Sequence, residues 1–149
     1  MRAVVQRVTS ASVTVENETV GAIDAGMMVL IGVSKEDTDK DLKYIVEKVP
    51  NLRIYDDENG VMNRSILDVG GSILAVSQFT LYGDARGGRR PSYFQAAGPE
   101  MANEFYERAV AAWRNQGIHV ETGRFRTEMK VSLVNDGPVT ILLDSEKAF

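Results

Sequence analysis

The chain has 149 residues, of which 17 are Lys or Arg and 21 are Asp or Glu, so its net charge at pH 7 is −4. We expect one domain spanning residues 1–149, with a core large enough to fold without disulfides or metals. The absence of Cys excludes disulfides, cysteine nucleophiles and Cys-ligated zinc. The acidic balance argues against broad nonspecific nucleic-acid binding but leaves room for a local basic patch. With neither the apolar core of a signal peptide nor a run of about 18 apolar residues, the chain is predicted to be cytoplasmic, with no membrane partner.

Strand patterns dominate the first half of the chain. Residues 2–16 alternate apolar and polar side chains, and a change of phase near residues 7–10 indicates a bend or bulge in that strand. Turns are expected at residues 21–26, a second buried strand at residues 27–33, and short strands with turns at residues 52–72.

Two substantial helices are predicted. Thr38 is expected to begin the first helix, with Asp41 completing a weak capping box, and Pro50 to end it. Pro99 is a favoured first-turn residue for the second helix, and Gly117 is expected beyond its end. The buried faces of the two helices are predicted to consist of Leu42, Ile45, Val46 and Val49, and of Met101, Phe105, Ala109, Ala112 and Trp113.

The chain returns to strand patterns at residues 118–121 and 128–143. The predicted fold is therefore α/β: a single compact domain with a mixed, mostly antiparallel, barrel-like sheet and two main helices. Strands and helices do not alternate regularly, so a doubly wound parallel sheet is not expected.

Residues 135–140, Asn-Asp-Gly-Pro-Val-Thr, join two runs with strand alternation and predict a hairpin. Pro138 is unusual there, because a Pro entering a strand removes a backbone donor and restrains Gly137 before it. A plain Asn-Gly turn would connect two strands as well. Either this backbone is placed for a function, or the Pro merely starts the second strand.

A second polar stretch, SQFTLYGD at residues 77–84, ends a buried strand at residues 73–76. In an extended chain Gln78 and Thr80 share one face, while Ser77 and Phe79 share the other. Polar side chains at the end of a buried strand either point into a cleft or simply reach solvent, and composition does not distinguish the two.

A Gly-rich loop with three arginines follows this stretch. Arg86, Arg89 and Arg90 either hold phosphates or form an ordinary solvated loop. Other candidates for a basic patch are Arg124, Arg126 and Lys130.

The side chains available for catalysis are few. The one His, His119, has no recognisable partners for a Ser-His-Asp triad, and a structural or partly exposed role suits it better. No phosphate-binding loop or dinucleotide fingerprint is present. Thr80 is a weak nucleophile without a neighbouring base. An ester is an activated substrate, however, and backbone N–H groups around its developing oxyanion supply several kcal/mol.

The motifs SQFTLYGD at 77–84 and NDGPVT at 135–140 resemble the two signature motifs of the D-aminoacyl-tRNA deacylases, also known as D-tyrosyl-tRNA deacylases. The resemblance extends over the whole chain, including the opening MRAVVQRVTSASVTVE and the segments GRRPS at 88–92 and HVETGRF at 119–125. The chain departs from the family at Arg126 and Thr127, where small residues are common. If these two border the pocket, its affinity or side-chain preference differs.

The resemblance implies a homodimeric hydrolase that cleaves the ester between a D-amino acid and the 3′-terminal adenosine of tRNA, with glycyl-tRNA as a further substrate. It implies no cofactor and no metal. The residues that would form the catalytic pocket are Ser77, Gln78, Phe79 and Thr80. Thr80 is the nucleophile in one account of the family, whereas backbone groups and the tRNA 2′-hydroxyl act in another.

The resemblance also assigns roles outside that pocket. The peptide bond between Gly137 and Pro138 would be cis and would reach into the active site of the partner subunit, where its carbonyls exclude L-amino acids. Apart from the resemblance, the charge of the Gly-rich loop leads us to expect that Arg86, Arg89 and Arg90 bind the phosphates of the tRNA and take no part in the chemistry.

Two other functions remain open. A binding module would hold the tRNA end in the same pocket without turnover, and the missing triad favours this mildly. A small-molecule esterase would act without RNA, although the arginine loop speaks against it.

Overall fold

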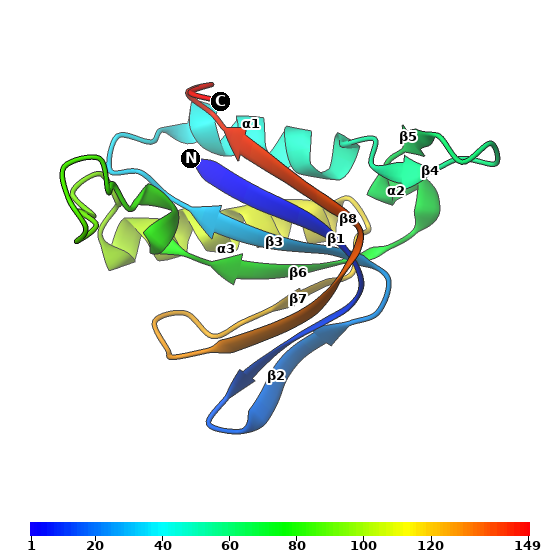
Figure 1. The fold of residues 1–149 in the computed structure, drawn as a ribbon, viewed down its shortest axis with the longest axis horizontal. Coiled ribbons are helices and arrows are strands. Elements are labelled where there is room, and N and C mark those ends of the chain that lie inside the picture. Colours follow the sequence, from blue (N-terminus) through cyan, green and yellow to red (C-terminus); the bar gives the residue numbers. More distant parts are fainter.

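The computed structural model describes all residues 1–149 and places eight strands beside two long helices (Figure 1). The elements, in chain order, are β1 (Arg2–Val15), β2 (Glu18–Ile23), β3 (Gly26–Gly32), α1 (Asp39–Asn51), β4 (Tyr55–Asp56), β5 (Met62–Arg64), α2 (Ile66–Val69), β6 (Ser72–Ser77), the 3₁₀ helix η1 (Phe79–Tyr82), α3 (Pro99–Asn115), β7 (Val120–Thr122) and β8 (Lys130–Asp144).

The long strand β1 organises the main sheet because it pairs with three other strands. Its first half is antiparallel to β3, its second half is antiparallel to β2, and β8 runs antiparallel along its other edge. From β3 the sheet continues in parallel through β6 to β7. Gly21 of β2 lies so close to the carbonyl of Thr122 in β7 that a side chain would not fit, so the sheet nearly closes on itself. The predicted α/β domain with a mixed, barrel-like sheet and two main helices is confirmed.

The two long helices cover one face of this sheet (Figure 1). Side chains such as Val5, Val29 and Ile73 point from the strands into a core shared with Ile45 of α1 and Trp113 of α3. None of the helices combines the length and the apolar character that crossing a membrane would require.

Three of the four ends of these helices lie where the sequence predicts them, the exception being the end of α1. The Asp41 carboxylate accepts the N–H of Thr38 at 2.8 Å, which completes the capping box of α1. α3 begins at Pro99, and Gly117 follows its end with φ at +85°, a conformation that favours glycine.

Pro50 lies inside the last turn of α1, which ends one residue later than predicted, at Asn51. Pro has no N–H, so the carbonyl of Val46 lacks its usual helical partner. Trp113 of α3 donates its indole N–H to this carbonyl at 3.1 Å. The proline thus opens an acceptor that ties the two helices together.

The other face of the sheet is covered at only one end. There β1 curls over with β2 and β8, and residues such as Val8, Val13 and Leu74 form a second, smaller core. At the other end the outward-facing side chains remain open to solvent, and Leu142 keeps 55% of its surface exposed.

The predicted hairpin at residues 135–140 is wrong, because β8 is one long strand beside β1 (Figure 1). Gln6 pairs with Thr140 and Val8 with Asn135, so residues 136–139 bulge out opposite Arg7. The peptide bond between Gly137 and Pro138, inside this bulge, is cis. We call residues 135–140 the β8 bend.

Candidate active site

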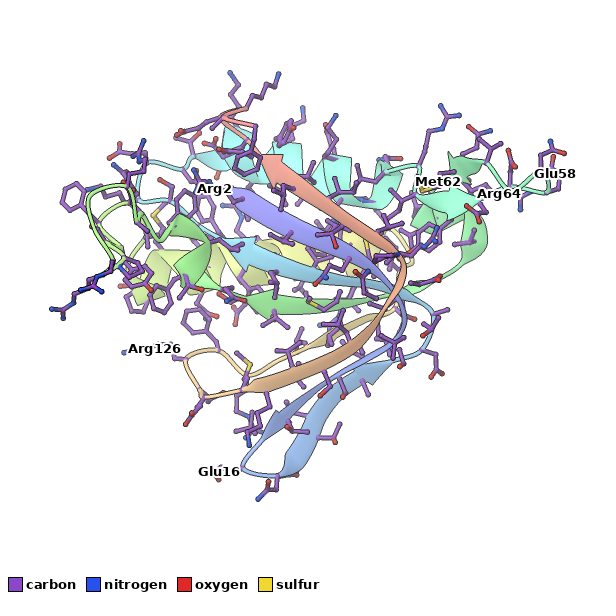
Figure 2. All side chains as sticks on the ribbon, viewed as in Figure 1. Arg2, Glu16, Glu58, Met62, Arg64 and Arg126 are labelled. Carbon is purple, nitrogen blue, oxygen red and sulfur yellow. The ribbon has the colours of Figure 1, made fainter.

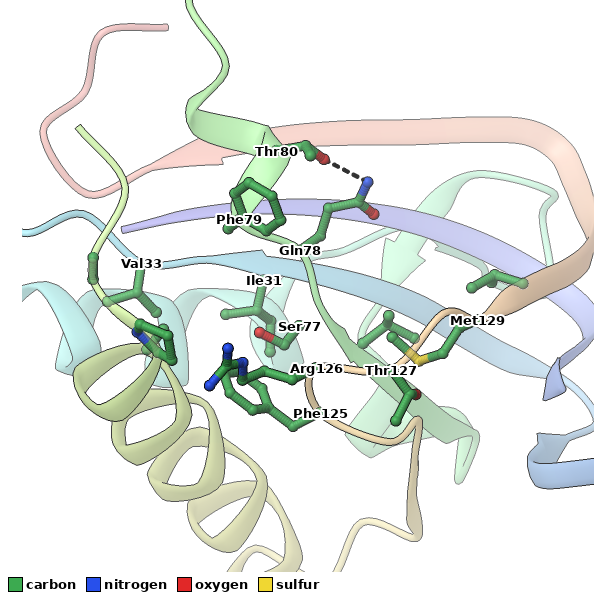
Figure 3. Close-up of a pocket in the computed structure, with 15 residues that line it drawn as sticks. Ile31, Val33, Ser77, Gln78, Phe79, Thr80, Phe125, Arg126, Thr127 and Met129 are labelled. Atoms are coloured by element: carbon green, nitrogen blue, oxygen red, sulfur yellow. Dashed lines mark hydrogen bonds between the residues drawn. The ribbon is translucent and has the colours of Figure 1, made fainter. Parts of the chain in front are cut away.

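A cavity of about 810 Å³ opens at the carboxyl ends of the parallel strands β3 and β6 (Figure 3). Ligands of sheets with parallel strands commonly bind at this end. The lining comes from five parts of the chain: the end of β3, the β6–η1 segment, the start of α3, the β7–β8 loop and the start of β8. Its residues are Ile31, Val33, Val76, Ser77, Gln78, Phe79, Thr80, Ala97, Pro99, Ala102, Phe125, Arg126, Thr127, Met129 and Val131.

The structure brings Ser77, Gln78, Phe79 and Thr80 together in this lining. The expected extended chain is wrong beyond residue 77, because η1 begins at Phe79. Gln78 and Thr80 therefore do not share the face of a strand. The turn instead lets the side-chain amide of Gln78 donate to the Thr80 hydroxyl at 2.8 Å (Figure 3).

The backbone of this segment is firmly held where β6 ends. The N–H of Gln78 donates to the carbonyl of Ile31 in β3 at 2.7 Å, and the N–H of Gly83 donates to the carbonyl of Thr80 at 2.9 Å. The first N–H groups of such a helical turn have no partner within the turn. The amides of Phe79 and Thr80 are thus candidate donors to a bound ligand.

The cavity holds almost no ionisable chemistry. Arg126 is the one ionisable side chain among its lining residues, and an arginine does not act as a base. His119 is outside the cavity, where its side chain keeps 65% of its surface exposed and lies 3.2 Å from the Glu121 carboxylate. The expectation of a partly exposed His119 is confirmed.

The β7–β8 loop supplies lining residues that the sequence pattern did not assign, above all Phe125. Arg126 and Thr127, the two positions at which the chain departs from the family motif, also border the cavity. Arg126 has φ at +59°, and Thr127 closes the turn by donating its hydroxyl to the carbonyl of Arg124 at 2.7 Å. Gly123 and the mostly polar residues after it are typical of a loop. No local sequence pattern predicts that this loop lies over β6.

The arginine loop lies beside the cavity and is exposed. The guanidinium of Arg86 donates two hydrogen bonds to the Asp84 carboxylate, at 2.9 and 2.8 Å, and the Arg86 backbone N–H donates a third at 3.0 Å. These bonds hold the pKa of Asp84 at about 2. Arg89 and Arg90 are exposed and take part in none of the ion pairs of the chain. They are therefore free to meet an anionic partner.

The β8 bend is separate from the cavity of its own chain. Gly137 and Pro138 are exposed and contribute nothing to the cavity lining. Asn135 holds the bend by donating to the carbonyls of Arg7 at 2.9 Å and Val139 at 3.0 Å. Arg7 in turn donates to the carbonyl of Ile54 at 2.7 Å, which fixes its position.

The model of the D-Tyr-tRNA(Tyr) deacylase family matches residues 4–144. A D-aminoacyl-tRNA deacylase of Desulfitobacterium hafniense is 62% identical over 149 residues and one of Thermosipho africanus is 60% identical, each comparison covering both chains completely.

Two solved structures are also similar. A c-Myc DNA unwinding element binding protein is 43% identical with a TM-score of 0.91, over 97% of this chain and 98% of that one. A probable eukaryotic D-amino acid tRNA deacylase is 20% identical with a TM-score of 0.82, over 96% and 98%, and this likeness supports the fold alone.

Proposed function

The chain belongs to the D-Tyr-tRNA(Tyr) deacylase family, and from this premise we propose that it hydrolyses the ester bond of D-aminoacyl-tRNA in the cavity at the ends of β3 and β6. The products are a D-amino acid and free tRNA. The observation that carries this proposal is the cavity itself, whose lining includes all four residues of the 77–80 segment of the family motif. The enzyme is expected to act in the cytoplasm, where tRNA is charged.

The chemistry of the cavity suits an ester. With no carboxylate, His or Lys among the lining residues, the site lacks a general base. Backbone N–H groups at the start of η1 would stabilise the oxyanion that forms when water attacks the ester carbonyl. The 2′-hydroxyl of the terminal adenosine, a group of the substrate itself, would be a further hydrogen-bonding group at the reacting ester.

Thr80 has a supporting part in this scheme. Its hydroxyl accepts a hydrogen bond from Gln78, which fixes the oxygen but does not remove its proton. A neutral threonine is a poor nucleophile. We therefore assign Thr80 a hydrogen bond to the reacting group and no covalent intermediate.

Rejection of L-substrates is assigned to the β8 bend acting in a second subunit. A pocket that admits many D-side chains has to measure chirality at the α-carbon, and fixed carbonyls do so by clash and unpaired polarity. Gly137 and Pro138 are exposed and held in place, yet they lie outside the cavity of their own chain. Their carbonyls therefore serve the cavity of a partner. Glycyl-tRNA, being achiral, passes such a filter.

The homodimer would form on the open end of the sheet. Leu142, Val4 and Leu30 lie side by side on β8, β1 and β3, and the next residue in this row, Val76, lines the cavity. A second copy docked on this apolar row would cover Leu142 and come close to both cavities. Two-fold symmetry would then give two equivalent sites.

The arginine loop would bind the backbone of the tRNA acceptor end. Arg89 and Arg90 offer guanidinium groups to phosphates, which arginine binds well. Arg86 is engaged by Asp84, so its share in phosphate binding is expected to be smaller.

The decisive experiment is deacylation of matched D- and L-tyrosyl-tRNA by the purified protein. The proposal requires turnover of the D-substrate and rejection of the L-substrate. Binding of charged tRNA without turnover would instead favour a binding module. Equal hydrolysis of D-tyrosine methyl ester and D-tyrosyl-tRNA would favour an esterase that does not use RNA.

A further inference from the structure

The segment from residue 84 to residue 98 leaves the cavity wall after η1 and returns to it at Ala97. It is tied down at both ends. Asp84 and Ser92 exchange two backbone hydrogen bonds of 2.8 Å, and the N–H of Ala97 donates to the carbonyl of Val33 at 2.8 Å. In Figure 1 this segment projects from the molecule as the green loop beyond the carboxyl end of β6. It is therefore a fixed extension of the cavity rim.

Two aromatic side chains stand on this loop. The ring of Tyr93 packs edge-on against Phe79 of the cavity wall, with 5.1 Å between ring centroids. Phe94, the next residue, keeps 74% of its surface exposed and is the most exposed of the large apolar side chains. A phenylalanine ring that is mostly in solvent buries little apolar surface, so it contributes little to the stability of the fold.

A cation accompanies the exposed ring. The Nζ of Lys35 lies 3.1 Å from the centroid of the Phe94 ring. The backbone N–H of Lys35 donates to the carbonyl of Gln95 at 2.9 Å, so the lysine is anchored to the same loop. Arg89 and Arg90 are exposed on the turn just before this ring.

An exposed aromatic ring beside lysine and arginine groups has the chemistry of a site for single-stranded nucleic acid. A base stacks on an aromatic face, which for Phe94 is the face opposite Lys35, and cations meet the phosphates. The net charge of −4 makes this cationic loop a local exception and not part of a generally basic surface.

We propose that Phe94 is a stacking platform for an unpaired base of the tRNA 3′ end, one that precedes the esterified terminal nucleotide. This inference rests on the proposed function, since it takes the terminal nucleotide to occupy the cavity. The geometry agrees with such a path. Phe94 directly follows Tyr93, which contacts Phe79 of the cavity wall, so an RNA strand that leaves the cavity along this loop would meet the ring. Lys35 and Arg89 would then lie along its phosphates.

The test compares D-tyrosine esters of increasing length: D-tyrosyl-adenosine, the D-tyrosyl ester of the tetranucleotide ACCA, and D-tyrosyl-tRNA. In Phe94→Ala, KM should rise about fivefold to 100-fold for the two longer substrates, the usual effect of one stacked base, while kcat stays close to the wild-type value. The adenosine ester serves as the internal reference, because it does not reach the ring. Phe94→Tyr keeps an aromatic face and should restore the wild-type KM. Val61→Ala, at another exposed apolar residue, is the matched control.

Two results would overturn the platform. KM could remain unchanged for all three substrates, or it could rise equally for the adenosine ester, which would place the effect inside the cavity. If the wild-type protein hydrolyses none of these esters, the proposed function fails, and binding of fluorescent ACCA RNA then decides the platform alone. In that assay the site requires weaker binding by Phe94→Ala, and equal binding would refute it.

Discussion

At the scale of single residues, the Thr80 hydroxyl raises the question of how an ester is cleaved in a cavity without a base. Its one hydrogen bond within the chain comes from Gln78 at 2.8 Å. Thr80→Ala should lower kcat about tenfold to 100-fold, because a hydrogen bond to a charged centre contributes about 1.5–3 kcal/mol. Thr80→Ser keeps the hydroxyl and should remain within a few-fold of the wild type, as measured by single-turnover deacylation of D-tyrosyl-tRNA.

A second experiment, on the wild-type protein, separates this scheme from covalent catalysis. Rapid acid quench of the wild-type protein should trap no acyl group on Thr80. An acyl-Thr80 adduct that forms and decays at the rate of turnover would show that a base, supplied by the substrate, activates the threonine.

Arg89 and Arg90 act at a distance from the reacting bond. The double variant Arg89→Ala/Arg90→Ala should have a higher KM for charged tRNA than the wild type, with little change in kcat. It should also flatten the dependence of log KM on log salt, by about 0.7 to 0.9 for each phosphate that is no longer neutralised by an arginine.

Arg64 provides the control for the arginine loop. It is paired with Glu58 at the other end of the molecule (Figure 2). Arg64→Ala should leave both KM and the salt slope unchanged. A fall in kcat at constant KM in the loop variant would contradict the assignment of these arginines to RNA binding.

At the scale of elements, the β8 bend interrupts a long strand with a bulge whose residues Gly137 and Pro138 are exposed. Asn135→Ala removes the two hydrogen bonds to the carbonyls of Arg7 and Val139. The free energy of unfolding should fall by about 1–3 kcal/mol, measured by urea denaturation. Because the carbonyls of the bend then lose their fixed position, the ratio of D- to L-tyrosyl-tRNA turnover should fall as well.

Asn103→Ala is the matched control, since Asn103 is half-buried on α3 and its side chain bonds only to Glu107. Its effect on stability should stay within about 0.5 kcal/mol. A destabilised Asn135→Ala variant that keeps the wild-type D to L ratio would remove the bend from stereochemical selection.

The β8 bend also shows which features the sequence predicts correctly and which it does not. Alternation on both sides of residues 135–140 correctly predicts two extended runs. That alternation is the same whether the runs pair with each other or lie end to end beside β1, so it predicts the strands correctly and the hairpin wrongly. The true hairpin, at Glu16 and Asn17, has positive φ at both residues, as a type I′ turn requires. The sequence pattern does not indicate it, because Glu-Asn lacks the usual glycine.

The cavity shows the same limit. Residues 77–80 stand out because polar side chains end a buried strand, and their place in the lining agrees with that pattern. Ile31, Ala102 and Phe125 carry no such signal, since their approach depends on the parallel pairing of β3 with β6 and on the course of the β7–β8 loop. Long-range packing of this kind is not written in any local pattern. The starts of both long helices are predictable because capping is local, whereas the end of α1 lies one residue beyond Pro50.

At the scale of the whole molecule, the protein is expected to be active only as a homodimer. Light scattering at micromolar concentration should give about twice the chain mass of 16.4 kDa. Leu142→Glu places a charge in the proposed interface and should yield monomers that have lost deacylase activity. Val61→Glu, at an exposed apolar residue outside that row, should remain dimeric and active. A fully active Leu142→Glu monomer would exclude the shared site.

A mixed dimer tests whether the β8 bend acts across the interface. Gly137 has φ at +119°, and an added Cβ would lie 3.0 Å from the N–H nitrogen of Val139, so Gly137→Val should distort the bend. One subunit carries Gly137→Val with an intact cavity, and its partner carries an intact bend with a cavity disabled at Gln78 and Thr80. If the bend acts across the interface, the one working cavity faces the intact bend, and its ratio of D- to L-tyrosyl-tRNA turnover should equal that of the wild type. If the bend serves its own chain, this cavity should show the lowered ratio of the Gly137→Val homodimer. Dimers purified through two different affinity tags give the measurement, because each then contains a single functional cavity.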